Sequence, residues 1–204
     1  MWQRALIAAE SITAVILAGG RGKRMGGADK GLVDLNGRCL IEHLLHAIEP
    51  QVGAVMINAN RNLERYRAFG KPVFEDSMPD YQGPLAGFSQ AFARIDTPYL
   101  LTLPCDAPLL PDNFVARMAA ALEAEQADIA AAYDGERLHS IHALMKRALA
   151  GDLERYLAGG DRKIELWYRR HRLALVDFSD CPSAFRNINT DQERASLQRQ
   201  ESSQ

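Results

Sequence analysis

Cysteine is scarce in this sequence, and a strong charge of one sign and long apolar runs are missing. The three cysteines, Cys39, Cys105 and Cys181, lie far apart, with no CxxC pair and no Cys/His spacing typical of zinc. A sparse, odd count fits a reducing cytosol. The formal net charge is −2 at pH 7, which argues against a dedicated nucleic-acid-binding protein, because such domains carry a basic face. No run approaches the roughly 18 apolar residues of a membrane-spanning helix. We therefore expect a cytoplasmic protein with neither nucleic acid nor membrane as a partner.

The length of 204 residues suits one domain with a full core. The first residues contain an apolar stretch that resembles a weak signal peptide, but Glu10 and Ser11 interrupt it and the next run reads as a buried strand. We expect an N-terminal extension over residues 1–11, one domain over 12–200 and a frayed tail over 201–204.

Apolar runs typical of buried strands alternate with segments of helical periodicity. The expected strands cover residues 12–17, 52–57, 72–74, 99–103, 128–133, 138–145 and 173–177. The expected helices cover residues 40–48, 63–69, 84–95, 111–126, 147–158, 164–168 and 191–200. This alternation predicts an α/β fold, a three-layer sandwich with a mostly parallel, Rossmann-like sheet and helices on both faces.

The segment LAGGRGKRMGGADKG, residues 17–31, follows the first expected strand and is rich in glycine and cations. Its spacing matches neither the dinucleotide fingerprint G-x-G-x-x-G nor the P-loop G-x4-G-K-[ST]. A plain exposed turn is the alternative, but a turn does not need Arg21, Lys23, Arg24 and Lys30 against the single carboxylate of Asp29. Glycines free backbone N–H groups, and together with cations they form an anion site. We favour a phosphate-binding loop.

Polar residues follow three further strands. Asp106 comes just after the apolar run that ends in LPC, Asn58 follows the second strand, and Asp76 the third. Each residue alone is as easily a turn or cap residue. In open α/β sheets, however, ligands bind at the carboxyl edge of the strands, and Mg²⁺ takes one or two protein carboxylates plus substrate phosphates. Together the four strand ends predict one crevice with phosphate, nucleoside and metal contacts.

The loop LAGGRGKRMGGADKG resembles the signature loop of nucleotidyltransferases of the nucleotide-diphospho-sugar transferase fold. The segments VFEDSMPDYQGPLAG, LPCDAP and RNINTDQE are similar to those of one family, the molybdenum cofactor guanylyltransferases (molybdopterin-guanine dinucleotide biosynthesis protein A). The resemblance implies transfer of GMP from GTP to the phosphate of molybdopterin or Mo-molybdopterin, with release of pyrophosphate. It also implies Mg²⁺ as cofactor, and a molybdenum insertion protein and apo-molybdoenzymes or their chaperones as partners.

The resemblance also implies roles for individual residues. Asp106 would contact GTP and hold Mg²⁺, while Asn187 and Asn189 match positions on the pterin side. The other GTP contacts would be Leu17, Ala18, Gly19, Gly20, Lys30, Asn58 and Asp76. The nucleotide-binding part would cover about 12–110 and the pterin-side part about 111–200.

The chemistry of this transfer joins two anions, so charge repulsion is the main obstacle. We expect Lys30 and Arg24 to stabilise charge on the α-phosphoryl oxygens, with Asp106 completing the catalytic set. No general base is required, because a phosphate monoester with a second pKa of about 6 is largely ionised at pH 7. Positioning and electrostatics then carry the catalysis.

Other interpretations of the chain stay open at this point. A molybdopterin cytidylyltransferase, a sugar-1-phosphate nucleotidyltransferase of the same fold, or a non-catalytic nucleotide-binding adaptor in cofactor delivery are the alternatives. A basic cluster in the last third of the chain is either a salt-bridged surface or a contact for the anionic pterin. Its members are Arg162, Lys163, Arg169, Arg170, His171 and Arg172.

Overall fold

The computed structural model describes residues 7–19, 29–76 and 83–188. Its main feature is one sheet of seven strands in the order β5-β4-β1-β6-β8-β7-β9, and a small second sheet pairs β2 with β3. The strands are β1 Ile12–Leu17, β2 Asp34–Leu35, β3 Arg38–Cys39, β4 Ala54–Asn58, β5 Val73–Phe74, β6 Tyr99–Pro104, β7 Ile129–Tyr133, β8 Leu138–Lys146 and β9 Leu173–Asp177. The α-helices are α1 Leu40–Ile48, α2 Leu63–Arg67, α3 Pro84–Phe92, α4 Phe114–Ala124, α5 Ala150–Ala158 and α6 Ile164–Tyr168.

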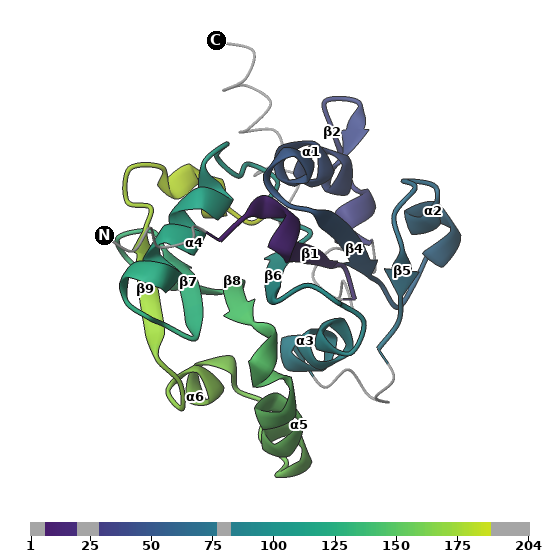
Figure 1. The fold of residues 1–204 in the computed structure, drawn as a ribbon. Coiled ribbons are helices and arrows are strands. Elements are labelled where there is room, and N and C mark those ends of the chain that lie inside the picture. Colours follow the sequence, from purple (N-terminus) through teal and green to yellow (C-terminus); the bar gives the residue numbers. More distant parts are fainter. Residues whose placement is uncertain (1–6, 20–28, 77–82, 189–204) are drawn as a thin grey trace.

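The sheet is mostly parallel, as predicted. β1 pairs in parallel with β4 and with β6, β4 with β5, and β7 with β9, whereas β8 runs antiparallel to both β6 and β7. β1 lies between β4 and β6, so the chain builds the sheet outward from β1 in both directions (Figure 1). The carboxyl ends of β4, β1 and β6 therefore meet at a topological switch point, where α/β folds bind their ligands.

Helices cover both faces of the sheet. Figure 1 shows α1 and α4 on one side and α3, α5 and α6 on the other. Two buried clusters match this division: one contains the apolar sides of α1 and α4, the other those of α3, α5 and α6. Successive side chains of β1 alternate between them, since Ile16 belongs to the first cluster and Val15 to the second. The three-layer prediction is confirmed.

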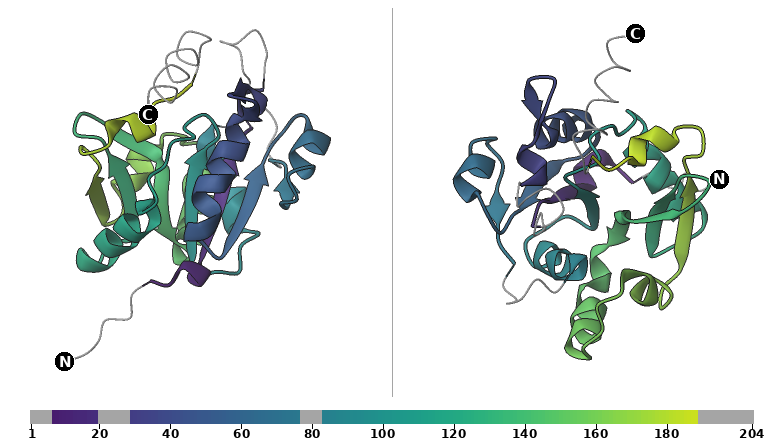
Figure 2. Two further views of the ribbon diagram at one scale, coloured as in Figure 1. Left: turned by 90° about the horizontal axis from the view of Figure 1, so that it is seen from above. Right: turned by 180° about the vertical axis from the view of Figure 1, so that it is seen from behind.

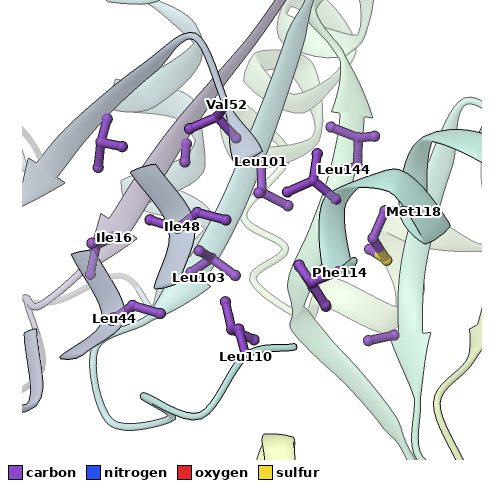
Figure 3. Close-up of a cluster of buried hydrophobic side chains, with 14 of the residues drawn as sticks. Ile16, Leu44, Ile48, Val52, Leu101, Leu103, Leu110, Phe114, Met118 and Leu144 are labelled. Atoms are coloured by element: carbon purple, nitrogen blue, oxygen red, sulfur yellow. The ribbon is translucent and has the colours of Figure 1, made fainter. Parts of the chain in front are cut away.

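The first cluster joins the two halves of the chain. Figure 3 shows Ile16 and Leu103, from neighbouring strands, packing with Leu44 of α1 in one interior with Phe114 and Met118 of α4. Figure 2 shows the sheet from two further sides, with the strands of the early chain at one end and β9 of the late chain at the other. The seven-stranded sheet thus runs through both parts of the chain, and β4, β1 and β6 lead into the residues of the site described below.

The predicted elements in the described residues are all present, with bounds that agree to within three residues. The bounds of β1, β9, α1 and α6 are those predicted. α4 begins three residues later than expected, at Phe114, because the preceding residues form a turn in which Phe114 N donates to Pro111 O. β4 starts and ends later than expected and includes Asn58. The predicted helix over 191–200 and the tail over 201–204 lie outside the described residues.

The first described residues contact the turn that precedes β4. Residues Ala9–Ser11 form a short 3-10 helix, and Ala9 O accepts a hydrogen bond from Gly53 N at 2.7 Å. A Cβ on Gly53 would lie 2.7 Å from Glu10 Cα, so glycine is needed for this close approach. That residues 1–11 are a dispensable extension stays a prediction. Within the described part of the chain, no helix combines the length and apolar character that a membrane crossing requires.

Candidate active site at the carboxyl edge of the sheet

The strands that carry the predicted site residues end level with one another. Leu17, the last residue of β1, pairs with Asn58 on β4 and with Pro104 on β6. Two hydrogen bonds extend this pairing past the strand ends: Ala18 N donates to Asn58 O at 2.8 Å, and Cys105 N donates to Leu17 O at 3.2 Å. The predicted contacts Leu17, Ala18 and Gly19 therefore lie between those on β4 and those that follow β6.

Lys30 and Asp106 form an ion pair across this edge. The Lys30 ammonium lies 2.8 Å from Asp106 Oδ2, and the side chains are 28% and 10% exposed. Lys30 opens the 3-10 helix Lys30–Leu32 at the far end of the glycine loop, while Asp106 follows β6. The structure thus brings together the cation and the carboxylate that we predicted to act on phosphate and metal.

Asp76 is held by two asparagines of the β4 end. Asn58 Nδ2 donates to Asp76 Oδ1 at 3.0 Å, and Asn60 Nδ2 donates to Oδ2 at 2.8 Å. Asn60 Oδ1 in turn accepts from the backbone N of Asp76 at 2.8 Å. The two predicted residues Asn58 and Asp76 therefore form one unit. The sequence analysis missed Asn60, although the alternation of asparagines in NANRN, residues 58–62, is a signal for it.

Two glycines allow the backbone to approach this unit. A Cβ on Gly19 would lie 2.7 Å from Asn60 Nδ2, and a Cβ on Gly87 would lie 3.0 Å from both Asn58 Oδ1 and Leu17 Cδ2. Both distances are shorter than ordinary side-chain contacts. Glycine at these two positions lets the start of the loop and α3 pack directly against the asparagines.

Of the carboxylates at this edge, Asp76 is bound by Asn58 and Asn60 and Asp29 by Asn62 and Tyr66. We therefore assign Asp106 to a divalent cation. Among the residues that the structure describes, no group of three or more His, Cys, Asp or Glu side chains is placed to hold a metal. This donor set fits Mg²⁺, because that ion keeps several waters and takes few protein ligands besides substrate phosphates. Asp106 Oδ2 is at the same time the atom that Lys30 contacts.

The segment that contains Asn187 runs beside Asp106. Ile188 N donates to Asp106 O at 2.9 Å, and Ile188 is buried with Leu35 and Leu40. Asn187 itself is exposed next to this anchor. Arg24, Gly20 and Asn189, the remaining predicted site residues, lie outside the described part of the chain.

An aromatic cluster joins β8 to this same segment. His139 stacks on Phe185 at 4.6 Å between ring centroids, and His142 contacts Phe185 edge to face at 5.1 Å.

The ionisation of Asp134 and His142 depends on their neighbours. His139 Nε2 lies 2.6 Å from Asp134 Oδ2. Burial opposes the ionisation of Asp134, but hydrogen bonds from the backbone of Arg137 and from His139 outweigh it and hold the Asp134 pKa well below its usual range. Burial, and then the charge of His139, lower the pKa of His142 to about 3, so its imidazole is neutral.

The basic cluster of the last third is tied to acidic side chains. Arg170 contacts Asp152 at 3.0 Å and Arg172 contacts Asp128 at 3.7 Å. Trp167 Nε1 also donates to Asp152, at 3.0 Å. These contacts agree with the salt-bridged surface interpretation for the two arginines.

Comparison with known proteins gives consistent matches. The family model described as a MobA-like NTP transferase domain matches residues 14–174. The molybdenum cofactor guanylyltransferase of Shewanella loihica is 50% identical over 186 residues, which cover 91% of this chain and 95% of that protein. The protein of the same name from Shewanella pealeana is 49% identical over 189 residues, 93% of this chain and 94% of that one.

Solved structures share the fold. Molybdopterin-guanine dinucleotide biosynthesis protein A from Archaeoglobus fulgidus superposes with a TM-score of 0.76 at 20% identity, covering 94% of this chain and all (100%) of that one. A 4-diphosphocytidyl-2C-methyl-D-erythritol synthase from Anaerococcus prevotii gives a TM-score of 0.70 at 12% identity and covers 94% of this chain and 98% of that one.

Proposed function

This chain belongs to the MobA-like NTP transferase family, among the molybdenum cofactor guanylyltransferases, and from that premise we propose how its sheet edge transfers GMP from GTP to molybdopterin. The observation that carries the proposal is the Lys30–Asp106 ion pair at the switch point, one strand away from the Asn58–Asp76 unit. Lys30 can bind phosphate and Asp106 can bind a metal ion that contacts phosphate. The Asn58–Asp76 unit beside them offers hydrogen-bonding groups for a nucleoside.

In this proposal the nucleoside of GTP lies on the Asn58–Asp76 unit, and the triphosphate runs past Leu17, Ala18 and Gly19 toward Lys30. An oxygen of the molybdopterin phosphate attacks the α-phosphorus. A new P–O bond forms, the bond between the α-phosphorus and its bridging oxygen breaks, and the electron pair leaves with pyrophosphate. The attacking oxygen is already ionised at neutral pH, so no side chain has to remove a proton.

Charge repulsion between the two substrates explains why the proposed site contains cations and a metal-binding carboxylate. Two unit charges about 4 Å apart interact by about 4 kcal/mol at an effective dielectric near 20, so several such repulsions oppose the approach of the two substrates. The Lys30 ammonium offsets charge on the α-phosphoryl oxygens, and Arg24 is proposed to do the same. Mg²⁺, held by Asp106, would neutralise charge on the leaving pyrophosphate.

The acceptor side is proposed to lie along the segment that follows Phe185. Asn187 stands next to Ile188, whose backbone hydrogen bond to Asp106 brings this segment to the phosphate end of the site. Asn189, which the resemblance also assigns to the pterin, lies outside the described residues. This arrangement supports the division into a nucleotide-binding part over about 12–110 and a pterin-side part beyond it.

The test is thermal stabilisation by GTP, CTP, ATP and UTP, each with and without Mg²⁺. A ligand at 100 times its Kd adds about 2.7 kcal/mol to the free energy of unfolding. We expect a shift with GTP that Mg²⁺ increases, and the Asp106→Ala variant should lose the increase. Selective stabilisation by CTP or UTP would instead favour a cytidylyltransferase or a sugar-1-phosphate enzyme. No response to any nucleotide would contradict the site.

A further inference from the structure

Asp29, the residue before Lys30, is buried in a polar clamp. Its side chain accepts a hydrogen bond from the Tyr66 hydroxyl at 2.5 Å on Oδ1 and one from Asn62 Nδ2 at 3.0 Å on Oδ2. Asp29 is 9% exposed and Tyr66 is fully buried. The clamp joins the far end of the glycine loop to α2, which belongs to the connection between β4 and β5.

Asn62 is specialised for this contact. It precedes α2 in the left-handed conformation, with φ of 50°, and its side chain makes no capping hydrogen bond to that helix. Asparagine is one of the few residues that tolerates this conformation, and its amide reaches Asp29, 33 residues away along the chain. The Asn62 side chain therefore binds Asp29 of the loop and does not cap the N-terminus of α2.

Tyr66 is suited to be a permanent donor. Burial, together with the negative charges of nearby groups, raises the pKa of its hydroxyl well above the usual range, so the proton stays on the tyrosine. Glycine at position 31 also leaves room for the Tyr66 hydroxyl. A Cβ on Gly31 would lie 2.7 Å from that hydroxyl and 3.3 Å from Cys105 Cβ. Gly31, the residue after Lys30, therefore lies against both Tyr66 and Cys105, the residue before Asp106.

Backbone hydrogen bonds connect the clamped Asp29 to Lys30. Asp29 O accepts from Leu32 N at 3.0 Å, and Lys30 O accepts from Val33 N at 3.1 Å, which forms the short 3-10 helix that Lys30 opens. Asp29 and this turn thus fix the backbone position from which the Lys30 side chain extends toward Asp106.

One short segment binds two of the acidic side chains at this edge. Asn58 and Asn60 bind Asp76, while Asn62 and Tyr66 bind Asp29. Residues 58–66 therefore connect the proposed nucleoside contact with the residue next to the proposed phosphate contact.

We propose that Asp29, clamped by Tyr66 and Asn62, is a positioning residue that fixes the Lys30 ammonium for transfer, and that residues 58–66 set its spacing from Asp76. This inference rests on the proposed function of Lys30. The clamp acts on the transition state through Lys30 and touches no substrate itself.

The test removes single donors from the clamp. Tyr66→Phe deletes only the hydroxyl, and Asn62→Gly deletes the amide while keeping a residue that tolerates positive φ. We expect kcat for GMP transfer to fall about tenfold or more in each variant, with KM for GTP changed less than about threefold. Tyr156→Phe is the matched control, because it deletes another tyrosine hydroxyl. Tyr156 lies in α5, far along the chain from the site, and its hydroxyl donates to Lys163 O at 2.9 Å.

A second readout separates positioning from general loss of structure. Labelling of Lys30 by an amine-reactive ester, quantified by mass spectrometry in the absence of substrates, should rise several-fold in Tyr66→Phe and Asn62→Gly and stay unchanged in Tyr156→Phe. Unchanged labelling alongside a lower kcat, or a kcat equal to that of the wild type, would overturn the clamp.

A double-mutant cycle completes the test. If Tyr66 acts through Lys30, Tyr66→Phe should have less than a twofold effect on the single-turnover rate in a Lys30→Ala background. An undiminished loss in that background would show that Tyr66 acts by another route. Failure of the proposed function is distinguishable, because wild-type protein would then show no stabilisation by GTP, whatever the clamp variants do.

Discussion

The Lys30 ammonium lies 2.8 Å from Asp106 Oδ2, although 76 residues separate the two in the chain. The pair is partly sheltered, with the carboxylate side chain 10% exposed. Lys30 therefore occupies an oxygen that a divalent cation would also use. In the proposed site, Mg²⁺ and the Lys30 ammonium would compete for Asp106, and this competition leads to the first two predictions.

Asp106→Ala should reduce turnover by at least a thousandfold, because it removes the only carboxylate that we assign to the metal. The measurement is GMP transfer at saturating GTP over a range of Mg²⁺ concentrations. Asp112→Ala, at an exposed aspartate six residues further along, is the control and should keep normal activity. Near wild-type turnover of Asp106→Ala at high Mg²⁺ would remove Asp106 from the metal site.

Lys30→Ala should bind a divalent cation more tightly than the wild type when no nucleotide is present. The substitution leaves Asp106 without the 2.8 Å ion pair, so a cation no longer competes with an ammonium. Mn²⁺ titration followed by electron paramagnetic resonance measures this affinity, and we expect a gain of severalfold together with a large loss of turnover. A weaker affinity for Mn²⁺ would argue against the competition.

Gly87→Ala should weaken GTP binding, whereas Gly151→Ala should not. Both glycines lie in helices, where alanine is favoured by up to about 1 kcal/mol. A Cβ on Gly87 meets Asn58 Oδ1 and Leu17 Cδ2 at 3.0 Å, while a Cβ on Gly151 has no atom nearer than 3.5 Å, on the flexible end of Arg155. Thermal stabilisation by GTP checks this, and an equal response of both variants would contradict a role for close packing at Gly87.

Stability should fall on mild acidification because of His142. Its pKa is about 3 in the folded protein and 6.5 in the unfolded chain, so below pH 6.5 the unfolded state takes up a proton that the folded state does not. Stability is therefore complete above pH 6.5 and is lost as the pH falls toward 3, at up to about 1.4 kcal/mol per pH unit.

His142→Phe removes this titration. Between pH 6.5 and pH 5 the wild type should lose about 2 kcal/mol more of its free energy of unfolding than the variant. Urea unfolding at the two pH values measures the difference, and any packing cost of the larger ring cancels because it is the same at both. Equal losses in the two proteins would mean that His142 takes up its proton without unfolding.

The edge of the sheet was predictable because parallel strands place their carboxyl ends together. Apolar runs followed by Asn58 and Asp106 were enough to locate it, and the glycine-cation loop indicated Lys30. Asn60 and Asn62 were not predictable in the same way, since their carboxylate partners depend on how the chain turns after β4. The positive φ of Asn62 is a property of that turn, and no periodicity in the sequence indicates it.

The direction of the strand over residues 138–145 was not predictable for a related reason. Strand periodicity predicts that residues 138–145 are extended, but it does not say that the strand runs against its neighbours. Only the antiparallel pairing of β8 brings His139 to the same edge as Asp106 and allows it to stack on Phe185. Long-range pairing, rather than local propensity, decides these contacts.

The reversed direction of β8 has an architectural consequence. β7 ends at the carboxyl edge and β8 begins there, so the turn over residues 134–137 is a tight hairpin on the same rim as the loops that follow β1, β4 and β6. Such a hairpin changes length or composition without a crossover helix having to move. A change in the turn over residues 134–137 would therefore leave the parallel pairing of β1 with β4 and β6 in place.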